Sequence, residues 1–351
     1  MRRIKKHNDF KIHILFKFIE GPYGGGNQFL KALRDYFNEI GIYSEKPEEA
    51  DIILFNSHHC LSEVFRLKKR YSDKILIHRI DGPVFLYTKK IKITDKIIYD
   101  FNKLFADANI FQSKWSRKKN YEEGMKKSNR EAIIMNAPNP HLFNNKNKSR
   151  FNAKKIKIIA TAWAPIESKG FDIYQYLDEN LDFSKYEMIF VGESPIKFKN
   201  IKWIKPVPSK KLAEILKQQD IYLTASKNDP CSNSLIEALS CGLPAIVRND
   251  GGHPELVKKG GVLFEGEKDI FAKIEKVSQN YIYYTSKIPK YSINEVGESY
   301  YAFIKKIYND KKDKKYSPKQ ITFFRECNFY KIKIMILIRT ALSKIERLIK
   351  K

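Results

Sequence analysis

The chain is 351 residues long, and 42% of its residues are hydrophobic and 13% aromatic. This length suits two domains of about 150 residues, and the apolar content excludes a disordered chain. Lys and Arg total 66 against 40 Asp and Glu, which gives a net charge of +26. An anionic partner such as nucleotide phosphates or an anionic membrane face is therefore expected. The basic residues are spread along the chain, so nucleic acid is not the expected partner.

The cysteine pattern and the short apolar runs predict a cytoplasmic protein. The four cysteines have neither C-x-x-C spacing nor a nearby ligand set, which argues against a zinc site and a disulfide framework. They are Cys60, Cys231, Cys241 and Cys327. The apolar stretch 12–16 is too short for the core of a signal peptide. The longest apolar run, 334–338, is far shorter than the roughly 20 residues that span a bilayer.

Strand-like and helix-like segments alternate along the chain, which predicts parallel sheets with crossover helices. In the first half, strands are expected at about 11–18, 51–56, 74–80, 108–112 and 131–135, and helices near 27–40 and 113–125. In the second half, strands are expected near 156–162, 187–192, 201–204, 220–224 and 243–247, and helices near 169–181, 208–218, 232–240 and 253–259. Two doubly wound sheets of this kind bind ligands in a cleft between their strand carboxyl ends.

The segment 136–155 is rich in Asn, Pro, Lys and Ser and lacks apolar periodicity, so we place a domain boundary near residue 150. A further helix is expected over 292–308. The tail after it has apolar residues at helical spacing, flanked by basic residues. These apolar residues are Ile334, Ile338, Ala341, Leu342, Ile345, Leu348 and Ile349. The pattern fits a basic amphipathic helix on an anionic membrane surface, and equally a helix docked on its own domain.

Two loops that open helices are candidates for phosphate binding. The first, 21–27, contains Gly25, Gly26 and Asn27, and its glycines let the backbone approach an anion at a helix amino terminus. An ordinary strand-to-helix turn also favours glycine. The second loop carries Lys169 at a helix start, where a lysine can meet a diphosphate; the alternative is a solvated surface lysine.

The stretch 229–244, D-P-C-S-N-S-L-I-E-A-L-S-C-G-L-P, is the most specific part of the sequence. Asp229 and Glu237 are eight positions apart, on a loop and on the helix that it starts, so both can point into one crevice. Ser232, Asn233 and Ser234 supply hydroxyl and backbone N–H groups for phosphate oxygens. Glu237 could accept hydrogen bonds from ribose hydroxyls, as acidic residues do in other nucleotide sites.

This stretch resembles the retaining GT-B glycosyltransferases of family 4 (glycosyl transferases group 1), whose signature is E-x7-E followed by Ala-[Leu/Met]-x-x-Gly-x-Pro. The resemblance covers about 10–308. It implies an α/β, GT-B fold of two Rossmann-like, doubly wound parallel-sheet domains that face a central cleft, with a C-terminal helical tail. It implies that Glu237 binds the nucleotide ribose and that Asp229 faces the donor sugar. It also implies that Lys169 and the Gly25-Gly26 pair lie near the donor diphosphate.

The sequence departs from that family at three places. Asp229 replaces the first Glu of the signature. No Arg precedes Lys169, because the segment 162–164 reads Ala-Trp-Ala; Arg248 is a candidate replacement. Asp81 stands where the family often carries a His, so a His-specific role is not carried over.

The candidate site residues follow from the motifs and the resemblance together. The candidate catalytic residues are Lys169, Asp229 and Glu237. The candidate donor-binding residues are Gly25, Gly26, Asn27, Asp81, Lys169, Val207, Ser232, Asn233, Ser234 and Glu237. No metal ligands are assigned, because a D-x-D motif is absent and the His58-His59 pair and His253 do not form a ligand set.

The resulting expectation is a metal-independent glycosyltransferase that moves a sugar, with retention, from a nucleoside-diphosphate donor to a glycan, lipid-linked or protein acceptor. The donor is a co-substrate, and no cofactor is expected. Residues 1–150 would form the acceptor-side domain, 151–290 the nucleotide-sugar domain, 291–310 a helix returning to the first domain, and 316–351 the basic tail. A cytoplasmic location is expected, with a peripheral position at the inner membrane face as an alternative. Epimerases and phosphorylases share the fold. A degenerate protein that binds nucleotide or glycan without turnover is the second hypothesis.

Overall fold

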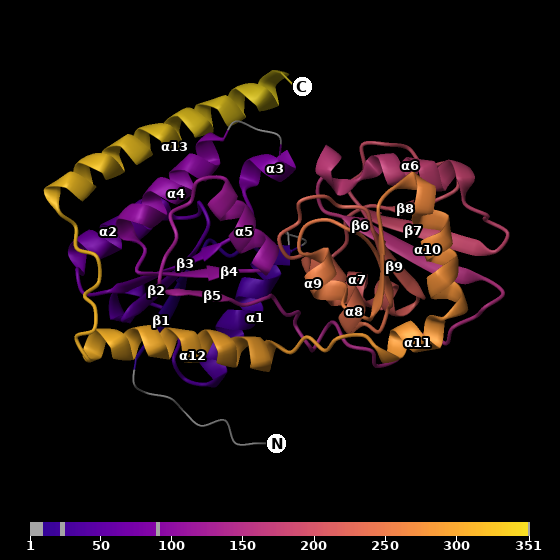
Figure 1. Ribbon diagram of the computed structural model, residues 1–351, viewed down its shortest axis with the longest axis horizontal. Helices are drawn as coiled ribbons and strands as arrows, with labels where there is room; N and C mark the ends of the chain where they lie inside the picture. The colour runs from indigo at the N-terminus through magenta and orange to yellow at the C-terminus, as the bar shows by residue number, and fades with distance from the viewer. Residues whose placement is uncertain (1–9, 22–24, 89–91, 350–351) are drawn as a thin grey trace.

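The structure is a computed structural model that describes residues 10–21, 25–88 and 92–349, the last seven of these as backbone only. Within the described residues, two parallel sheets form the centres of two α/β domains (Figure 1). The first sheet has the order β1-β2-β3-β4-β5. Its strands are β1 (Ile12–Leu15), β2 (Ile52–Asn56), β3 (Ile75–Ile80), β4 (Ala108–Phe111) and β5 (Glu131–Ile133).

Helices cover both faces of the first sheet, because all-parallel strands expose apolar side chains alternately to each side. These helices are α1 (Gly25–Glu39), α2 (Leu61–Arg70), α3 (Val84–Thr88), α4 (Ile93–Phe105) and α5 (Lys114–Glu122), with the short 3-10 helix η1 (Pro47–Glu49). On one face Ile52 and Leu54 of β2 join the core that α1 contributes through Phe37. On the other face Ile53 and Phe55 join the core of α2 and α4.

The second domain repeats this architecture with a sheet of order β11-β10-β9-β6-β7-β8. Its strands are β6 (Ile156–Ala162), β7 (Tyr186–Gly192), β8 (Lys202–Ile204), β9 (Ile221–Thr224), β10 (Ala245–Arg248) and β11 (Gly261–Phe264). Its helices are η2 (Glu167–Lys169), α6 (Phe171–Asn180), α7 (Ser209–Lys217), α8 (Asn233–Ser240), α9 (His253–Val257), α10 (Glu267–Gln279) and α11 (Tyr281–Ser286). The predicted fold class, two doubly wound parallel-sheet domains with a C-terminal helical region, is confirmed.

Several elements differ from the expected ones. The strand expected over 11–18 pairs only over Ile12–Leu15. Strand β11 and helices α10 and α11 were not predicted at all. Strand β11 is four residues long, and three of them are only half-buried, so its apolar signal is weak. Strand β11 is placed by its pairing with β10, in which Ala245 is opposite Gly261. This pairing forms only in the tertiary structure, so the local sequence does not predict it.

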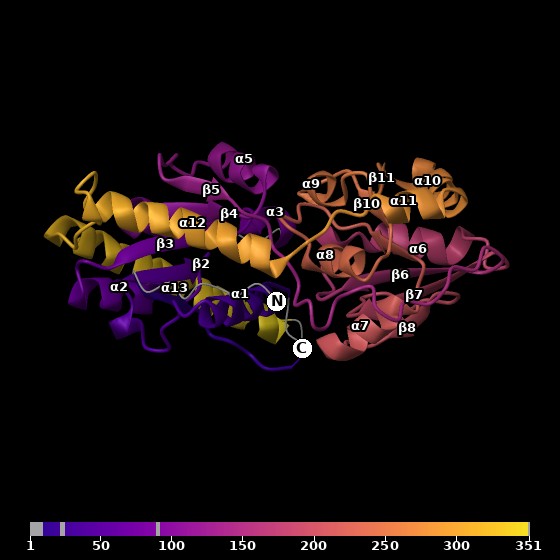
Figure 2. The same ribbon diagram turned by 90° about the horizontal axis from the view of Figure 1, so that it is seen from below.

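The segment 136–155 is more than a spacer. Asn136 and Ala137 are fully buried, and Phe143 packs into the core of the second domain beside α8. Beyond α11 the chain crosses back to the first domain as α12 (Ile293–Lys312), which lies along that domain in both views (Figures 1 and 2). Tyr300 and Ile304 of α12 are buried in the same core as α1. Helix α12 therefore ties the two halves of the chain together.

The tail forms the long helix α13 (Phe323–Ile349) on the face of the first domain opposite α12 (Figure 1). Its buried residues are Phe329 and Ile332, whereas the predicted stripe residues Ile334 and Ile338 are exposed. The side chains of Ile345, Leu348 and Ile349, which completed the predicted stripe, lie outside the described part of the chain. No helix in the described residues is long and apolar enough to cross a bilayer.

Candidate functional site

A cavity of about 890 Å³, counted with the solvent at its mouth, lies at the carboxyl ends of the second sheet and is closed on one side by α1. Strand β6 contributes Thr161 and Ala162, and strand β7 contributes Val191 and Gly192. Eight predicted site residues line it. They are Gly25, Lys169, Val207, Asp229, Ser232, Asn233, Ser234 and Glu237. Parallel strands place such residues together because their loops all emerge at one edge of the sheet.

Lys169 and Asp229 form an ion pair on the cavity wall, with 3.3 Å between Nζ and Oδ2. Burial raises the pKa of Asp229, but Lys169, His253 and the hydrogen bond from the Cys231 amide together outweigh this effect and hold the pKa below its usual value. The carboxyl group is therefore ionised at neutral pH. The turn that carries Lys169 depends on Gly170, whose φ is +75° and whose added Cβ would lie 2.3 Å from the Ala225 carbonyl oxygen.

Two helix amino termini meet at the cavity, those of α1 and α8. The approach is so close that a Cβ on Gly25 would lie 2.4 Å from the Cβ of Asn233, so only glycine fits there. Neither helix has an acidic residue in its first turn. Ser232 caps α8 by accepting a hydrogen bond from the Leu235 amide. The remaining free N–H groups and the two helix dipoles make this corner of the cavity attractive to anions.

Glu237 lies on α8, lines the cavity and is 8% exposed. Among the described residues no side chain or backbone group bonds to its carboxyl oxygens, although neighbouring hydroxyls are paired: Tyr222 donates to Ser234 at 2.9 Å. Burial alone raises the pKa of Glu237 to about 8. A buried acidic group with no protein partner is unfavourable unless a ligand or water occupies the cavity.

Three predicted donor-binding residues do not line the cavity. Gly26 has open space where a Cβ would stand, so a glycine is not required there. The Asn27 side chain is buried and turned to the loop before it, where it bonds the backbone N–H and C=O of Ile19. The intervening 22–24 of the glycine loop lie outside the described residues. Asn27 therefore supports the loop.

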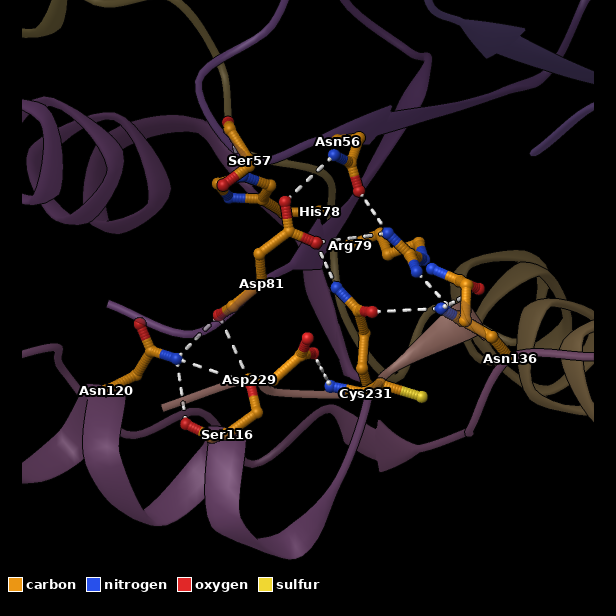
Figure 3. Close-up of polar contacts among 12 residues, drawn as sticks. Asn56, Ser57, His78, Arg79, Asp81, Ser116, Asn120, Asn136, Asp229 and Cys231 are labelled. Atoms are coloured by element: carbon orange, nitrogen blue, oxygen red, sulfur yellow. Dashed lines mark hydrogen bonds and ion pairs between the residues drawn. The ribbon is translucent and has the colours of Figure 1, made fainter. Parts of the chain in front are cut away.

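Asp81 is the third residue outside the cavity lining, and it belongs to a polar network of the first domain (Figure 3). Its Oδ1 accepts from Arg79 at 3.2 Å and from Gln112, and its Oδ2 accepts from Asn56 at 3.2 Å. Its backbone carbonyl accepts from Asn120. Both carboxylate oxygens and the backbone carbonyl of Asp81 accept hydrogen bonds from the first domain, so Asp81 has a structural role there.

Arg79 is the centre of that network and is 1% exposed. Its guanidinium also donates to Asn56, to Asn136 at 2.7 Å and to the Tyr300 hydroxyl at 3.2 Å. Asn136 in turn donates to Asn233 of the second domain at 3.0 Å. The network therefore joins the first sheet, the interdomain segment, α12 and the start of α8.

Trp163, in the segment 162–164 that has no arginine before Lys169, lines the cavity and is 45% exposed. Arg248 does not line the cavity, and its Nη1 is buried without a hydrogen-bond partner among the described residues. Arg248 is thus not placed as a second phosphate ligand. Trp163, Thr161 and Gln28 are lining residues that we did not select from the sequence. Gln28 follows the glycine loop by one residue and could have been found from that position.

Direct hydrogen bonds hold the domains around the cavity. Glu255 of α9 accepts from the backbone N–H groups of Lys114 and Trp115, at 2.9 and 2.8 Å, and so caps α5 of the other domain. The Ser113 hydroxyl donates to the Pro230 carbonyl at 2.6 Å. The sequence did not indicate this role of Glu255, since its partners lie about 140 residues away along the chain.

None of the histidines in the described part of the chain belongs to a set of metal ligands. His253 is buried beside Asp229, and burial lowers its pKa. His58 and His59 stack on each other at the end of β2, away from His253. Among the described residues no group of three or more His, Cys, Asp or Glu side chains could hold a metal ion.

Comparison with known proteins gives a family for part of the chain and a fold for most of it. Residues 196–292 match the family model described as "Glycosyl transferases group 1". No curated protein matches the chain in sequence. The solved structure of HepE from Anabaena in complex with UDP and glucose has a TM-score of 0.68 at 13% identity, over 85% of this chain and 100% of that one.

Two plant and cyanobacterial enzymes are similar as well. The catalytic domain of starch synthase IV from Arabidopsis thaliana, bound to ADP and acarbose, has a TM-score of 0.64 at 9% identity, over 86% of this chain and 99% of that one. Sucrose-phosphate synthase from Thermosynechococcus elongatus has a TM-score of 0.58 at 13% identity, over 81% and 79%. Residues 196–292 thus carry a domain of glycosyl transferases group 1, and the chain as a whole has the GT-B fold.

Proposed function

We propose that the chain transfers a sugar, with retention of configuration and without a metal ion, from a nucleoside-diphosphate donor bound in the cavity to a glycan, lipid-linked or protein acceptor, as family 4 enzymes do. The observation that carries the proposal is the cavity lining: a lysine, two helix amino termini and a buried acid without a partner among the described residues share one cavity. HepE and starch synthase IV were solved with UDP and ADP respectively, which supports a nucleotide ligand here.

Each group has a proposed role. The diphosphate lies between Lys169 and the start of α8, where positive charge and free N–H groups meet it. The ribose hydroxyls donate to the Glu237 carboxyl group and so supply the partner that it lacks among the described residues. Asp229, ionised and held by Lys169, faces the sugar. The base lies near Val207.

The proposed reaction needs no protein base. The acceptor hydroxyl attacks the anomeric carbon on the face that the diphosphate leaves; the bond from that carbon to the diphosphate oxygen breaks as the bond to the acceptor oxygen forms. The acceptor proton passes to the departing diphosphate oxygen. The protein contributes positioning and stabilisation of the negative charge on the leaving group, through Lys169 and the α8 amino terminus.

A second function is favoured by one observation: the segment 162–164 reads Ala-Trp-Ala, so the arginine that family members carry before the lysine is missing there. The chain would then bind nucleotide or glycan without turnover. All four cysteines are free thiols, which supports the proposed cytoplasmic location under either function.

The test is thermal stabilisation by UDP, GDP, ADP and their sugar conjugates, with and without EDTA, because a ligand that binds only the native state raises the melting temperature. A shift that EDTA leaves unchanged is expected for one nucleotide. The sugar conjugate of that nucleotide should then be slowly hydrolysed, and NMR of the first product anomer should show retention. A shift without hydrolysis would favour a protein that binds nucleotide without turnover. No shift with any nucleotide would contradict the transferase and leave only glycan binding without turnover.

A further inference from the structure

Helix α13 has two apolar faces, and only one of them is covered by the protein. The covered face lies on α4 and α2: the Phe329 ring stacks on Phe65 with 3.7 Å between centroids, and Ile332 is 1% exposed. Met335 and Ile336 continue this face into the same core. With 3.6 residues per turn, these positions follow one another along one side of the helix.

The opposite face carries a continuous row of large apolar side chains in contact with solvent. Six of the ten exposed large hydrophobic residues in the described part of the chain are on this helix. They are Phe323 (86%), Phe324 (69%), Tyr330 (51%), Ile334 (57%), Leu337 (62%) and Ile338 (46%). At 100° per residue, Phe323, Tyr330 and Ile334 point about 180° away from Ile332. Folding therefore leaves this face uncovered, although it runs for several turns.

The charged residues of α13 are mostly basic, which favours contact with an anionic surface. Lys331 and Lys333 are both exposed and lie on the two flanks of the row. The sequence of α13 has six basic and two acidic residues, a net charge of +4, in a chain of net charge +26. Glu326, the acidic residue among the described side chains of α13, is paired with Lys69. A second copy of so basic a chain would be repelled, whereas anionic lipid offers both an apolar layer and the opposite charge.

We propose that α13 lies flat on an anionic lipid bilayer, with Phe323, Tyr330, Ile334 and Leu337 inserted at the headgroup boundary and the flanking lysines at the lipid phosphates. The covered face then anchors the first domain to the helix, so docking needs no unfolding. This is an interfacial position, because α13 does not meet the length and apolarity of a spanning helix.

The docked helix would bring the first-domain side of the cleft to the membrane. Burial chiefly lowers the pKa of His58 and His59, at the end of β2, and the charge of Arg339, on the covered face of α13, adds to this effect in both. The end of β2 belongs to the carboxyl edge of the first sheet. Under the proposed function, the acceptor enters the cleft at this edge. A membrane-held, lipid-linked acceptor is therefore the class that this placement favours; this step rests on the proposed function.

The main test is co-flotation of the full-length protein with phosphatidylglycerol-containing vesicles and with pure phosphatidylcholine vesicles. We expect binding to the anionic vesicles that weakens with added salt, and little binding to the zwitterionic ones. The double change Ile334→Glu and Leu337→Glu should weaken binding at least about tenfold, since it replaces inserted side chains by charges. The matched control is Ile282→Glu with Tyr283→Glu, an equally exposed apolar pair on α11 (81% and 53%), and it should bind as the unchanged protein does.

A second readout uses the one cysteine on the exposed face. Cys327 is exposed, whereas Cys231 and Cys241 are buried and Cys60 is half-buried. In a Cys60→Ser background, an environment-sensitive fluorophore on Cys327 should shift to the blue when anionic vesicles are added. An unchanged spectrum together with no flotation would overturn the proposal.

Two further outcomes separate this proposal from its alternatives. If the glutamate pair on α13 converts a dimer to a monomer in sedimentation and the unchanged protein ignores vesicles, the face is a protein interface and the lipid proposal is wrong. Melting shifts with soluble nucleotides do not involve α13. Nucleotide binding without vesicle binding would therefore remove only the membrane inference, and vesicle binding without any nucleotide shift would remove only the proposed function.

Discussion

The carboxyl edges of the two sheets occupy equivalent places in a shared architecture, but they use their polar residues in opposite ways. On the second sheet, Lys169 and Glu237 line an open cavity, and Glu237 has no partner among the described residues. On the first sheet, Arg79 and Asp81 are bonded to each other and to neighbouring amides. One edge keeps its polar groups available for a ligand, and the other uses them to hold the two domains and α12 in place. Equivalent positions in two similar domains therefore need not share a role.

Arg79→Met should have the largest effect of the changes that test this comparison, and the effect is on the free energy of unfolding. The change removes one of the donors to the Asp81 carboxylate and the arginine donor to the side-chain oxygens of Asn56 and Asn136, which are buried. Removing one partner of a buried ion pair costs about 3–5 kcal/mol, and urea unfolding measures it. Arg117→Met is the control, because Arg117 is 42% exposed and forms a single ion pair; it should cost less than about 1 kcal/mol. Equal losses in both variants would show that the network is not structural.

Lys169→Met should act on turnover. Loss of a group that stabilises the leaving diphosphate typically lowers kcat by about 100- to 1000-fold, and release of nucleoside diphosphate from the donor measures it. Lys227→Met is the matched control, since Lys227 is a partly exposed lysine of the same domain with an ion pair to Asp172; its activity should stay within about twofold. Activity of Lys169→Met within tenfold of the unchanged protein would contradict the assigned role.

Glu237→Gln should change how stability depends on pH. In the folded protein Glu237 has a pKa of about 8, against an ordinary value of 4.5. Between these values the folded state holds the proton that the unfolded state has lost, so the unfolding free energy of the unchanged protein falls as pH rises from 4.5 through 8. We expect Glu237→Gln to gain about 2 kcal/mol relative to the unchanged protein over that range, less than the full shift because the cavity admits water.

Urea titrations of both proteins at pH 5 and pH 9 would show this difference. A constant gap between them at the two pH values would mean that the Glu237 carboxyl ionises normally. Nucleotide affinity of the same variant, measured by calorimetry, tests the ribose contact separately.

The smallest effect is expected from Glu255→Ala, which removes the cap that joins the domains. Loss of a helix cap typically costs about 1 kcal/mol, and the nucleotide Kd should rise by up to about fivefold if the closed arrangement is less populated. Glu265→Ala is the control, because Glu265 accepts from Asn249 within its own domain. A nucleotide Kd that is unchanged in Glu255→Ala would show that this contact does not help to close the cleft.

Much of the architecture could be predicted from the sequence. Apolar runs such as 51–56 and 156–162, separated by helical segments, are local patterns, and local patterns follow from the periods of strands and helices. The spacing of Asp229 and Glu237 and the position of Lys169 after β6 place them at one edge of a parallel sheet, and the structure brings all three into one cavity. These features could be predicted because they depend on residues that are close together in the sequence and not on distant partners.

Other features depended on the tertiary structure. The sequence did not separate Asp81 from the ligand-facing residues, because its partner Gln112 lies 31 positions away. Glu255 and the unpartnered state of Glu237 likewise depend on residues that only folding brings near or keeps away. Helix α13 is apolar on two sides, so its periodicity does not select the side that is buried. The packing of Phe329 against Phe65 determines which side is buried. The two faces are locally equivalent, and this long-range contact removes apolar surface from water on only one of them.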